Sequence, residues 1–267
     1  EMNKKIVFCG GGNMAEGIMR GLLDNKVIAP ENVTVSELRS DRCEYLSKTY
    51  GVAAVTDAND AIKKADIVII ALLPQHVPGV TKTLKELINE NTIVMSIAAG
   101  ITIDDLKNQL NSNAKIARVI PNTLIQSGNG YSAVCLSEHC DDQDKLSIEE
   151  ILNALGQIMY LKEDMFDLFQ ILGNVGPLWL YKTVEALTDA GVYVGFNRVD
   201  SRKIAIKNML GVAGVLDITD EHPAVKVDQM ASPGGVTIEA LKVLQEEGFS
   251  TAIMNSVIAG VKKLKSE

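Results

Sequence analysis

The sequence predicts an α/β fold, with a mostly parallel sheet in its N-terminal part and an all-helical domain in its C-terminal part. Two observations predict this. Short β-rich runs alternate with helical segments through roughly the first 160 residues, and the strand patterns fade after Asp164. Repeated strand–helix–strand units imply right-handed crossovers and therefore parallel strands. We expect one domain over residues 1–162 and a second over residues 163–267.

Eight runs of the first part are typical of strands. Their residues are 5–9, 32–36, 52–55, 66–73, 92–98 and 115–120, with 130–137 and 156–161 predicted as edge strands. The unbroken apolar stretch at 67–73 favours a strand that is covered on both faces. Intervening segments such as 44–50 and 80–88 have apolar residues at helical spacing.

The second part contains helical patterns that are apolar over more than one face. Such an extent of apolar helix surface is uncommon in a monomeric bundle. We therefore expect a homodimer, or a higher homo-oligomer, in which part of this surface is shared between subunits.

The composition of the 267-residue chain is that of a globular protein, with 46% hydrophobic residues. Its net charge of −8 argues against nucleic acid or an anionic membrane as a partner. The longest apolar run, residues 67–74, is too short to span a bilayer, and no signal-like segment precedes the first predicted strand. We expect a cytoplasmic protein that acts on a small molecule.

Four cysteines are scattered along the chain without a C-x-x-C pair. Cys135 and Cys140 lie near His139, but their spacing matches no zinc pattern and a fourth ligand is missing. We expect no metal site, and thiols that serve as small apolar residues in a reducing compartment.

The first strand–helix turn carries a dinucleotide-binding pattern. Gly10, Gly12 and Ala15 have G-x-G-x-x-A spacing directly after a predicted strand and at the start of a helix. Gly10 permits the tight turn, Gly12 lets the backbone approach a pyrophosphate, and Ala15 allows close packing of helix on strand. The helix N-terminus offers free N–H groups to the phosphates. The first domain is therefore predicted to be Rossmann-type; a merely structural glycine turn is the alternative.

The end of the second predicted strand bears on the choice between NAD and NADP. Glu37 lies where an acid holds the ribose 2′-OH, which favours NAD. Ser36, Arg39 and Arg42 are suited instead to a 2′-phosphate, which arginine binds through two hydrogen bonds. Alternatively, Asp41 and Arg42 only belong to the first exposed turns of the next helix. We predict NADP, with NAD as the alternative.

Residues 232–237, Ser-Pro-Gly-Gly-Val-Thr, interrupt two helical segments. Pro233 ends the first helix, while Gly234 and Gly235 allow unusual dihedrals and let a ligand touch the backbone. The next helix starts near Val236, so its unpaired N–H groups point into the loop and suit a small carboxylate. The alternative is an ordinary helix–turn–helix link with a serine N-cap.

Four segments together resemble pyrroline-5-carboxylate reductase. They are residues 8–23, 118–123, 185–198 and 232–249, in order along nearly the whole chain, and the Ser-Pro-Gly-Gly loop followed by Thr is the most specific. The resemblance implies a Rossmann domain, a helical dimerisation domain and an NAD(P)-dependent oxidoreductase. The implied reaction reduces the cyclic imine Δ1-pyrroline-5-carboxylate to L-proline, the last step of proline biosynthesis.

The chain departs from the family pattern at three places. Leu73 precedes Pro74 where the family usually has Lys-Pro, and Leu124 follows Thr123 where it usually has proline. The family's Gly-Ser-Gly-Pro-Ala-Tyr turn corresponds to residues 173–181, and the substituted positions are Asn174, Val175, Leu178 and Trp179. These departures motivate two alternatives: reduction of another small cyclic imino acid or β-hydroxy acid, and a non-catalytic dinucleotide-binding paralogue.

The resemblance also implies which residues form the site. The cofactor-binding residues would be Gly10, Gly12, Asn13, Met14, Ser36, Arg39, Asn59, Leu72, Pro74, Ala98, Gly100 and Asn122. The substrate-binding residues would be Ser232, Gly234, Gly235, Thr237 and Asn122.

Thr237 is the catalytic candidate. In a dimer, the resemblance implies that its loop meets the nicotinamide held by the other subunit. Its hydroxyl would then hydrogen-bond the imine nitrogen and deliver, directly or through water, the proton that accompanies hydride transfer. Positioning of the substrate without proton transfer is the alternative role.

Overall fold

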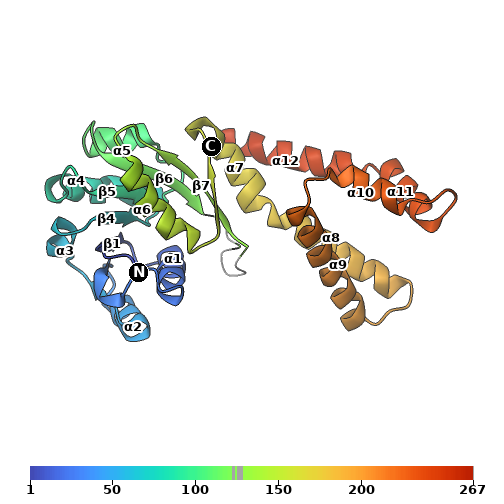
Figure 1. The fold of residues 1–267 in the computed structure, drawn as a ribbon, viewed down its shortest axis with the longest axis horizontal. Coiled ribbons are helices and arrows are strands. Elements are labelled where there is room, and N and C mark those ends of the chain that lie inside the picture. The colour runs from blue at the N-terminus through green and yellow to red at the C-terminus, as the bar shows by residue number, and fades with distance from the viewer. Residues whose placement is uncertain (122–123, 125–128, 267) are drawn as a thin grey trace. The chain divides into compact units, whose positions relative to one another are not determined.

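The computed structural model describes residues 1–121, 124 and 129–266. It consists of two compact units, unit 1 over Glu1–Phe166 and unit 2 from Asp167 onward, coloured from blue to red along the chain in Figure 1. Unit 1 carries the sheet and unit 2 is helical, so the predicted fold class is confirmed. The domain boundary placed at residue 162 stays a prediction.

Unit 1 is built on one eight-stranded sheet with the strand order β3-β2-β1-β4-β5-β6-β7-β8. The strands are β1 (Ile6–Cys9), β2 (Val33–Ser36), β3 (Ala53–Val55), β4 (Ile67–Ile70), β5 (Ile93–Ser96), β6 (Lys115–Pro121), β7 (Tyr131–Leu136) and β8 (Gln157–Tyr160). Pairing is parallel from β3 through to β6, β7 is antiparallel to β6, and β8 is parallel to β7. The segment predicted as an edge strand over 130–137 is therefore internal, because β8 pairs outside it.

Helices cover both faces of this sheet (Figure 1). They are α1 (Asn13–Asp24), α2 (Ser40–Tyr50), α3 (Asn59–Lys63), α4 (Val77–Leu87), α5 (Ile103–Gln109) and α6 (Asp142–Asn153), with the 3₁₀ turns η1 (Pro30–Asn32), η2 (Pro74–His76) and η4 (Glu163–Met165). One hydrophobic cluster joins α1, α2 and α6 to one face, and a second cluster joins α3, α4 and α5 to the other.

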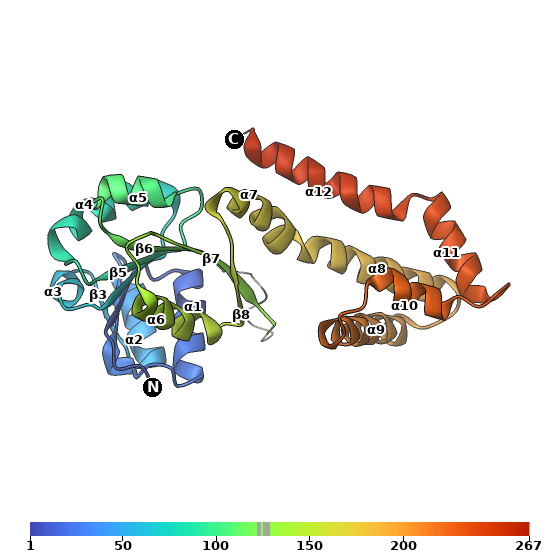
Figure 2. The same ribbon diagram turned by 45° about the horizontal axis from the view of Figure 1, so that its top comes forward.

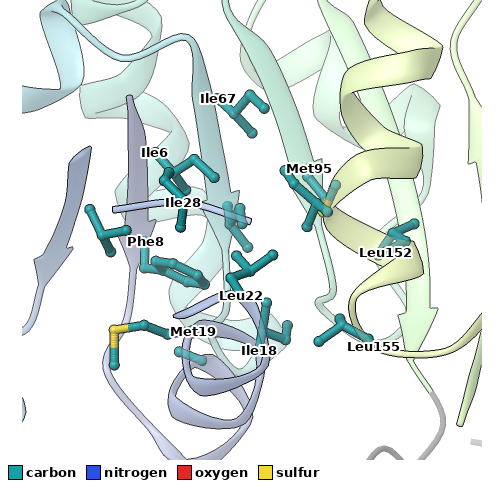
Figure 3. Close-up of a cluster of buried hydrophobic side chains, with 14 of the residues drawn as sticks. Ile6, Phe8, Ile18, Met19, Leu22, Ile28, Ile67, Met95, Leu152 and Leu155 are labelled. Carbon is teal, nitrogen blue, oxygen red and sulfur yellow. The ribbon is translucent and has the colours of Figure 1, made fainter. Parts of the chain in front are cut away.

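The central strands are buried on both sides, as their apolar runs predict. All four residues of β4 are 0% exposed, which is typical of a parallel strand between two helix layers. Figure 3 shows Phe8 of β1 close to Ile18 and Leu22 of α1, with Leu152 of α6 in the same cluster. This packing fixes the strand ends from which the site loops emerge.

A partly buried ion pair anchors the C-terminal end of unit 1. Nη1 of Arg118 in β6 donates to Oε1 of Glu163 at 2.9 Å, and its guanidinium lies 4.8 Å from the ring centroid of Phe166. The same carboxylate oxygen accepts the backbone N–H of Ile103 at 2.8 Å. These contacts hold the chain against the sheet as far as Phe166.

Unit 2 is an assembly of helices. After α7 (Phe166–Phe169) come the π-helix η5 (Gln170–Val175), α8 (Pro177–Tyr193), α9 (Arg198–Ile218), α10 (Pro223–Met230), α11 (Val236–Glu246) and α12 (Phe249–Lys265). Helices α8 and α9 lie side by side (Figures 1 and 2). Helix α11 contacts α12, and α12 in turn contacts η5.

Large apolar side chains remain exposed in unit 2. Leu210 and Val212 of α9 are 57% and 59% exposed, and Met254 of α12 is 64% exposed. Among the described residues of α10, α11 and α12, none is buried. None of the helices that the structure describes combines the length and apolar character needed to cross a membrane.

Candidate active site

The cofactor residues predicted in unit 1 all follow the carboxyl ends of parallel strands. Gly10, Gly12, Asn13 and Met14 follow β1, Ser36 and Arg39 end or follow β2, Asn59 begins α3 after β3, Leu72 and Pro74 follow β4, and Ala98 and Gly100 follow β5. Because the carboxyl ends of neighbouring parallel strands share one edge of the sheet, the fold brings these residues to that edge. Asn122 lies outside the described residues.

Gly10 lies where the strand order reverses, between β2 on one side of β1 and β4 on the other. Its N–H donates to the backbone oxygen of Ser36 at 2.9 Å. Its φ is +104°, and a Cβ there would collide with the carbonyl oxygen of Ala71 and lie 2.9 Å from Cδ2 of Leu72. Only glycine fits this turn, and the reversal point is where open α/β sheets bind ligands.

Gly12 is the N-cap of α1, with extended φ and ψ of −75° and −172°. No side chain among the described residues caps this helix start, so its first N–H groups are free for a ligand. A Cβ on Gly12 would meet nothing within 4 Å, and the side chain of Met14 is 40% exposed. Free N–H groups facing open space fit a diphosphate.

Glu37, at the end of β2, reaches back to the glycine loop. Its Oε2 accepts the N–H of Gly11 at 3.2 Å, and its Oε1 accepts both the N–H and Nε of Arg39, at 3.0 and 3.3 Å. Partial burial disfavours the charge of this carboxylate, but the hydrogen bonds from Arg39 and Gly11 outweigh it and lower the pKa of Glu37. The carboxylate is therefore ionised beside the loop.

Glu16 of α1 is a second carboxylate at this loop, and sequence reasoning missed it. It accepts the hydroxyls of Tyr45 at 2.8 Å and Tyr50 at 2.6 Å, and it pairs with Nη2 of Arg42. Burial opposes its ionisation, yet these hydrogen bonds together lower the pKa of Glu16, and burial with the bond to Glu16 raises the pKa of Tyr50 to about 12. An acid in the first turn of a helix is the only local signal, since its partners lie far along the chain.

The remaining predicted residues line the same edge with different exposure. Ala98 is buried and its N–H donates to Oγ of Ser96 at 3.3 Å. Gly100 has a φ of +71° in the turn after β5. Asn59 is exposed, with its backbone N–H bonded to Oδ1 of Asp57 at 3.0 Å.

The four cysteines are free thiols. Cys9 ends β1 directly before Gly10, and burial raises the pKa of its thiol to about 12. Within the part of the chain that the structure describes, no three His, Cys, Asp or Glu side chains are grouped so that they could hold a metal ion.

The 232–237 loop of unit 2 leads into α11, whose start, like that of α1, has a glycine N-cap and no side-chain cap from the described residues. Helix α11 begins at Val236 with Gly235 as an extended N-cap, and among the described residues no side chain caps it. Gly234 has a φ of +67°, and the N–H of Gly235 donates to the backbone oxygen of Ser232 at 3.1 Å. A Cβ on Gly235 would collide with Oγ of Ser232. Thr237 lies in the first turn of α11, next to these free N–H groups.

The strand order and the glycine loop define a dinucleotide-binding oxidoreductase of the Rossmann class. Residues 5–100 match a family model described as NADP oxidoreductase, coenzyme F420-dependent, and residues 163–267 match one described as pyrroline-5-carboxylate reductase dimerisation. The chain is 31% identical to a pyrroline-5-carboxylate reductase of Arabidopsis thaliana over 97% of this chain and 94% of that relative. It belongs to the pyrroline-5-carboxylate reductase family, as its motifs predict.

Solved structures agree with this assignment. The pyrroline-5-carboxylate reductase of Coxiella burnetii is 27% identical, with a TM-score of 0.91 over 99% of this chain and 98% of that chain. The Plasmodium falciparum pyrroline carboxylate reductase, solved with NADP bound, is 26% identical with a TM-score of 0.84 and the same coverage. The predicted enzyme class, an NAD(P)-dependent oxidoreductase, is that of the family.

Proposed function

We propose that this protein reduces Δ1-pyrroline-5-carboxylate to L-proline with NADH or NADPH, the last step of proline biosynthesis. The relatives that match the chain almost end to end carry the name of this activity. The observation that carries the proposal is the start of α11 at 232–236, with its accessible glycine turn and extended glycine N-cap, because a reductase of this substrate needs a place for a small carboxylate besides its dinucleotide site.

The glycine loop of unit 1 would hold the dinucleotide. The N–H groups of Asn13 and Met14, at the uncapped start of α1 next to the open space at Gly12, would bind the diphosphate. The residues after β2 would take the adenosine ribose, with Asn59 near the adenosine, and those after β4 and β5 would line the nicotinamide. When bound, the reduced nicotinamide supplies the hydride.

The 232–237 loop would hold the substrate carboxylate. Gly234 and Gly235 leave the backbone of the turn accessible, and the start of α11 adds its free N–H groups and its partial positive charge. Ser232 offers a hydroxyl within the same turn, while Asn122, also predicted to bind the substrate, lies outside the described residues. This arrangement binds an anion without a fixed cationic side chain.

Thr237 is proposed to contact the imine nitrogen. A protonated imine accepts hydride better than a neutral one, so a hydroxyl that delivers a proton, directly or through water, would accelerate the reaction. A hydroxyl that only orients the ring would act through alignment. In both roles Thr237 touches the reacting atoms.

We further propose that two chains form the working unit, in the cytoplasm. The apolar side chains exposed on α8, α9 and α12 support a homodimer, because a lone helical unit with this surface would expose it to water. Four free cysteines support a reducing compartment. Light scattering of the purified chain tests the first point and cell fractionation the second.

Turnover of the purified full chain tests the proposed reaction. NADH or NADPH, each in turn, is expected to be oxidised only when pyrroline-5-carboxylate is added, with L-proline as the product. A panel with other cyclic imino acids and β-hydroxy acids addresses the departures at Leu73 and in residues 173–181. Absence of turnover above background with both cofactors contradicts the proposal. If only another compound of the panel is turned over, that compound takes the place of pyrroline-5-carboxylate as the substrate.

A further inference from the structure

Two carboxylates and two guanidinium groups meet around Gly11, at the carboxyl ends of β1 and β2. Glu37 bonds to the N–H of Gly11, and Nε of Arg42 donates to the carbonyl oxygen of Gly11 at 2.7 Å. Arg39 pairs with Glu37, and Arg42 pairs with Glu16. The formal charges of this cluster cancel, so it offers no excess positive charge to an additional phosphate.

Arg42 is held away from a ligand. Its side chain is only 16% exposed, and its guanidinium lies 4.9 Å from the ring centroid of Tyr45 while bonding to Glu16 and Gly11. Glu16 is itself fixed by two tyrosine hydroxyls. Releasing Arg42 toward a phosphate would leave a poorly exposed carboxylate without its cation, which is unfavourable.

Glu37 is held in place against the glycine loop by hydrogen bonds. Its side chain is 12% exposed. Its carboxylate accepts three hydrogen bonds: from the backbone N–H of Gly11, from the backbone N–H of Arg39 and from Nε of Arg39. A carboxylate has about four acceptor positions, so one remains for another donor. The absence of a side chain on Gly11 permits this approach, since a Cβ there would lie 3.2 Å from Cβ of Glu37.

These contacts discriminate between the two nicotinamide dinucleotides. A ribose 2′-OH can donate to the remaining acceptor position of Glu37, as the acid after the second strand of a Rossmann domain does. A 2′-phosphate has no such donor and adds up to about two negative charges against a carboxylate. We propose that Glu37 makes this protein prefer NADH over NADPH; this deepens the proposed function and rests on its dinucleotide site.

This preference differs from the choice of NADP drawn from the sequence, which rested on Ser36, Arg39 and Arg42. Both arginines are paired with carboxylates in the folded chain. Arg39 is 62% exposed and remains able to turn toward solvent. Turning it toward a phosphate would remove the cation that neutralises Glu37, so the repulsion between phosphate and Glu37 would persist.

Equilibrium binding of NADH and NADPH to the purified full chain, without imine substrate, tests the proposal. The wild-type chain is expected to bind NADH at least about tenfold more tightly, because like charges in contact are costly. Glu37→Gln keeps the shape and removes the charge, so NADPH affinity is expected to rise and the ratio to fall by about tenfold. Added salt should narrow the wild-type ratio, because it screens the phosphate from the carboxylate.

Glu44→Gln is the matched control, since it removes one carboxylate from α2, the helix that follows Glu37, at an exposed ion pair with Lys48. This control is expected to leave the binding ratio unchanged. Equal or tighter binding of NADPH by the wild-type chain overturns the proposal even if Glu37→Gln fails to fold. An unchanged ratio in a folded Glu37→Gln protein also overturns it. If the wild-type chain binds NADH and NADPH in the expected ratio but does not reduce the imine, only the proposed reaction is contradicted.

Discussion

The starts of α1 and α11, where we propose that anions bind, have nearly the same N-cap dihedral angles but different surroundings. Gly12 caps α1 with φ and ψ of −75° and −172°, and Gly235 caps α11 with −81° and 173°. Each follows a glycine with positive φ in the preceding turn. Yet α1 buries Ala15, Ile18, Met19 and Leu22, whereas no described residue of α11 is buried.

We infer from this difference that a single chain completes the first proposed anion site and does not complete the second. Apolar side chains of α1 pack into the core cluster on one face of the sheet, which fixes this helix. Helix α11 has its apolar side chains uncovered, Val243 at 56% and Leu244 at 49% exposure. We infer that a second chain supplies the missing cover, and each prediction below acts on one of the two starts.

The largest effect is expected from a substitution that disrupts the proposed subunit interface of unit 2. Leu210 of α9 lines an apolar hollow between α8 and α9. Leu210→Glu would bury a charge in the proposed interface, so we expect monomers and a loss of imine reduction of about 100-fold or more. Dinucleotide affinity should stay near the wild-type value, because unit 1 carries that site.

Size-exclusion chromatography with light scattering, followed by turnover assays, measures this effect. Leu146→Glu is the matched control, as Leu146 in α6 is 58% exposed against 57% for Leu210. It should leave both assembly and turnover intact. A fully active monomer would show that the α11 start needs no second chain.

The next largest effect is expected from Thr237, in the first turn of α11. Thr237→Ala removes the hydroxyl, and we expect kcat/KM to fall about 100-fold if that hydroxyl delivers a proton. A positioning role predicts a smaller loss, with the change mainly in KM. Thr237→Ser should restore most of the rate, and dinucleotide binding should not change. An unaltered kcat/KM would remove Thr237 from the chemistry.

A smaller effect is expected at the first helix start. Gly12→Ala places a methyl group in the open space where the diphosphate would lie, while a Cβ there meets no protein atom within 4 Å. We expect dinucleotide affinity to fall about tenfold, or about 1.4 kcal/mol, with the fold intact.

Calorimetric titration with NADH and NADPH measures this change. Gly17→Ala is the control, because a Cβ on Gly17 in the same helix also meets nothing within 4 Å. It should leave dinucleotide affinity unchanged and slightly raise Tm, since alanine is the better helix former. Equal affinities of Gly12→Ala and wild type would exclude this surface from the diphosphate site.

The last effect is on stability, and it leaves binding and turnover aside. Glu16→Gln weakens the bonds to Arg42, Tyr45 and Tyr50, and we expect a loss of about 2 kcal/mol in the free energy of unfolding at neutral pH. Because folding lowers the pKa of Glu16 below its ordinary value of 4.5, the ionised carboxylate stabilises the protein above that pH. This contribution is lost as pH falls from there through the folded-state value.

Thermal unfolding of both proteins between neutral and acidic pH checks the sign. The Tm difference between wild type and Glu16→Gln should be largest near neutrality and vanish in acid. Glu44→Gln, at a 70% exposed carboxylate, should show almost no difference at any pH. A Tm difference between wild type and Glu16→Gln that grows as the pH falls would contradict the assigned role of Glu16.

Most of the fold could be predicted because its strands are continuous apolar runs. β4 is the clearest case, with every residue buried. The place of β7 could not be predicted, since pairing with both β6 and β8 depends on contacts between distant segments. The π-helix at 170–175 was also missed, because residue types do not distinguish its hydrogen-bond pattern from that of an α-helix.

The candidate site could be predicted where backbone geometry demands glycine, and less well where side chains meet. Gly10 and Gly234 have the positive φ that their turns require. The contact of Glu37 with Gly11 joins residues 26 apart, and local spacing left both NAD and NADP open. Which carboxylate each arginine pairs with is decided by tertiary packing.

One further consequence follows from the position of Cys9, next to the glycine loop. Peroxides and alkylating reagents attack the thiolate and not the thiol. With a pKa of about 12, only about one Cys9 thiol in 10⁵ is ionised at neutral pH. Burial also raises the pKa of the other three thiols. Nucleotide binding by this chain should therefore survive oxidative stress that disables enzymes with exposed, acidic cysteines.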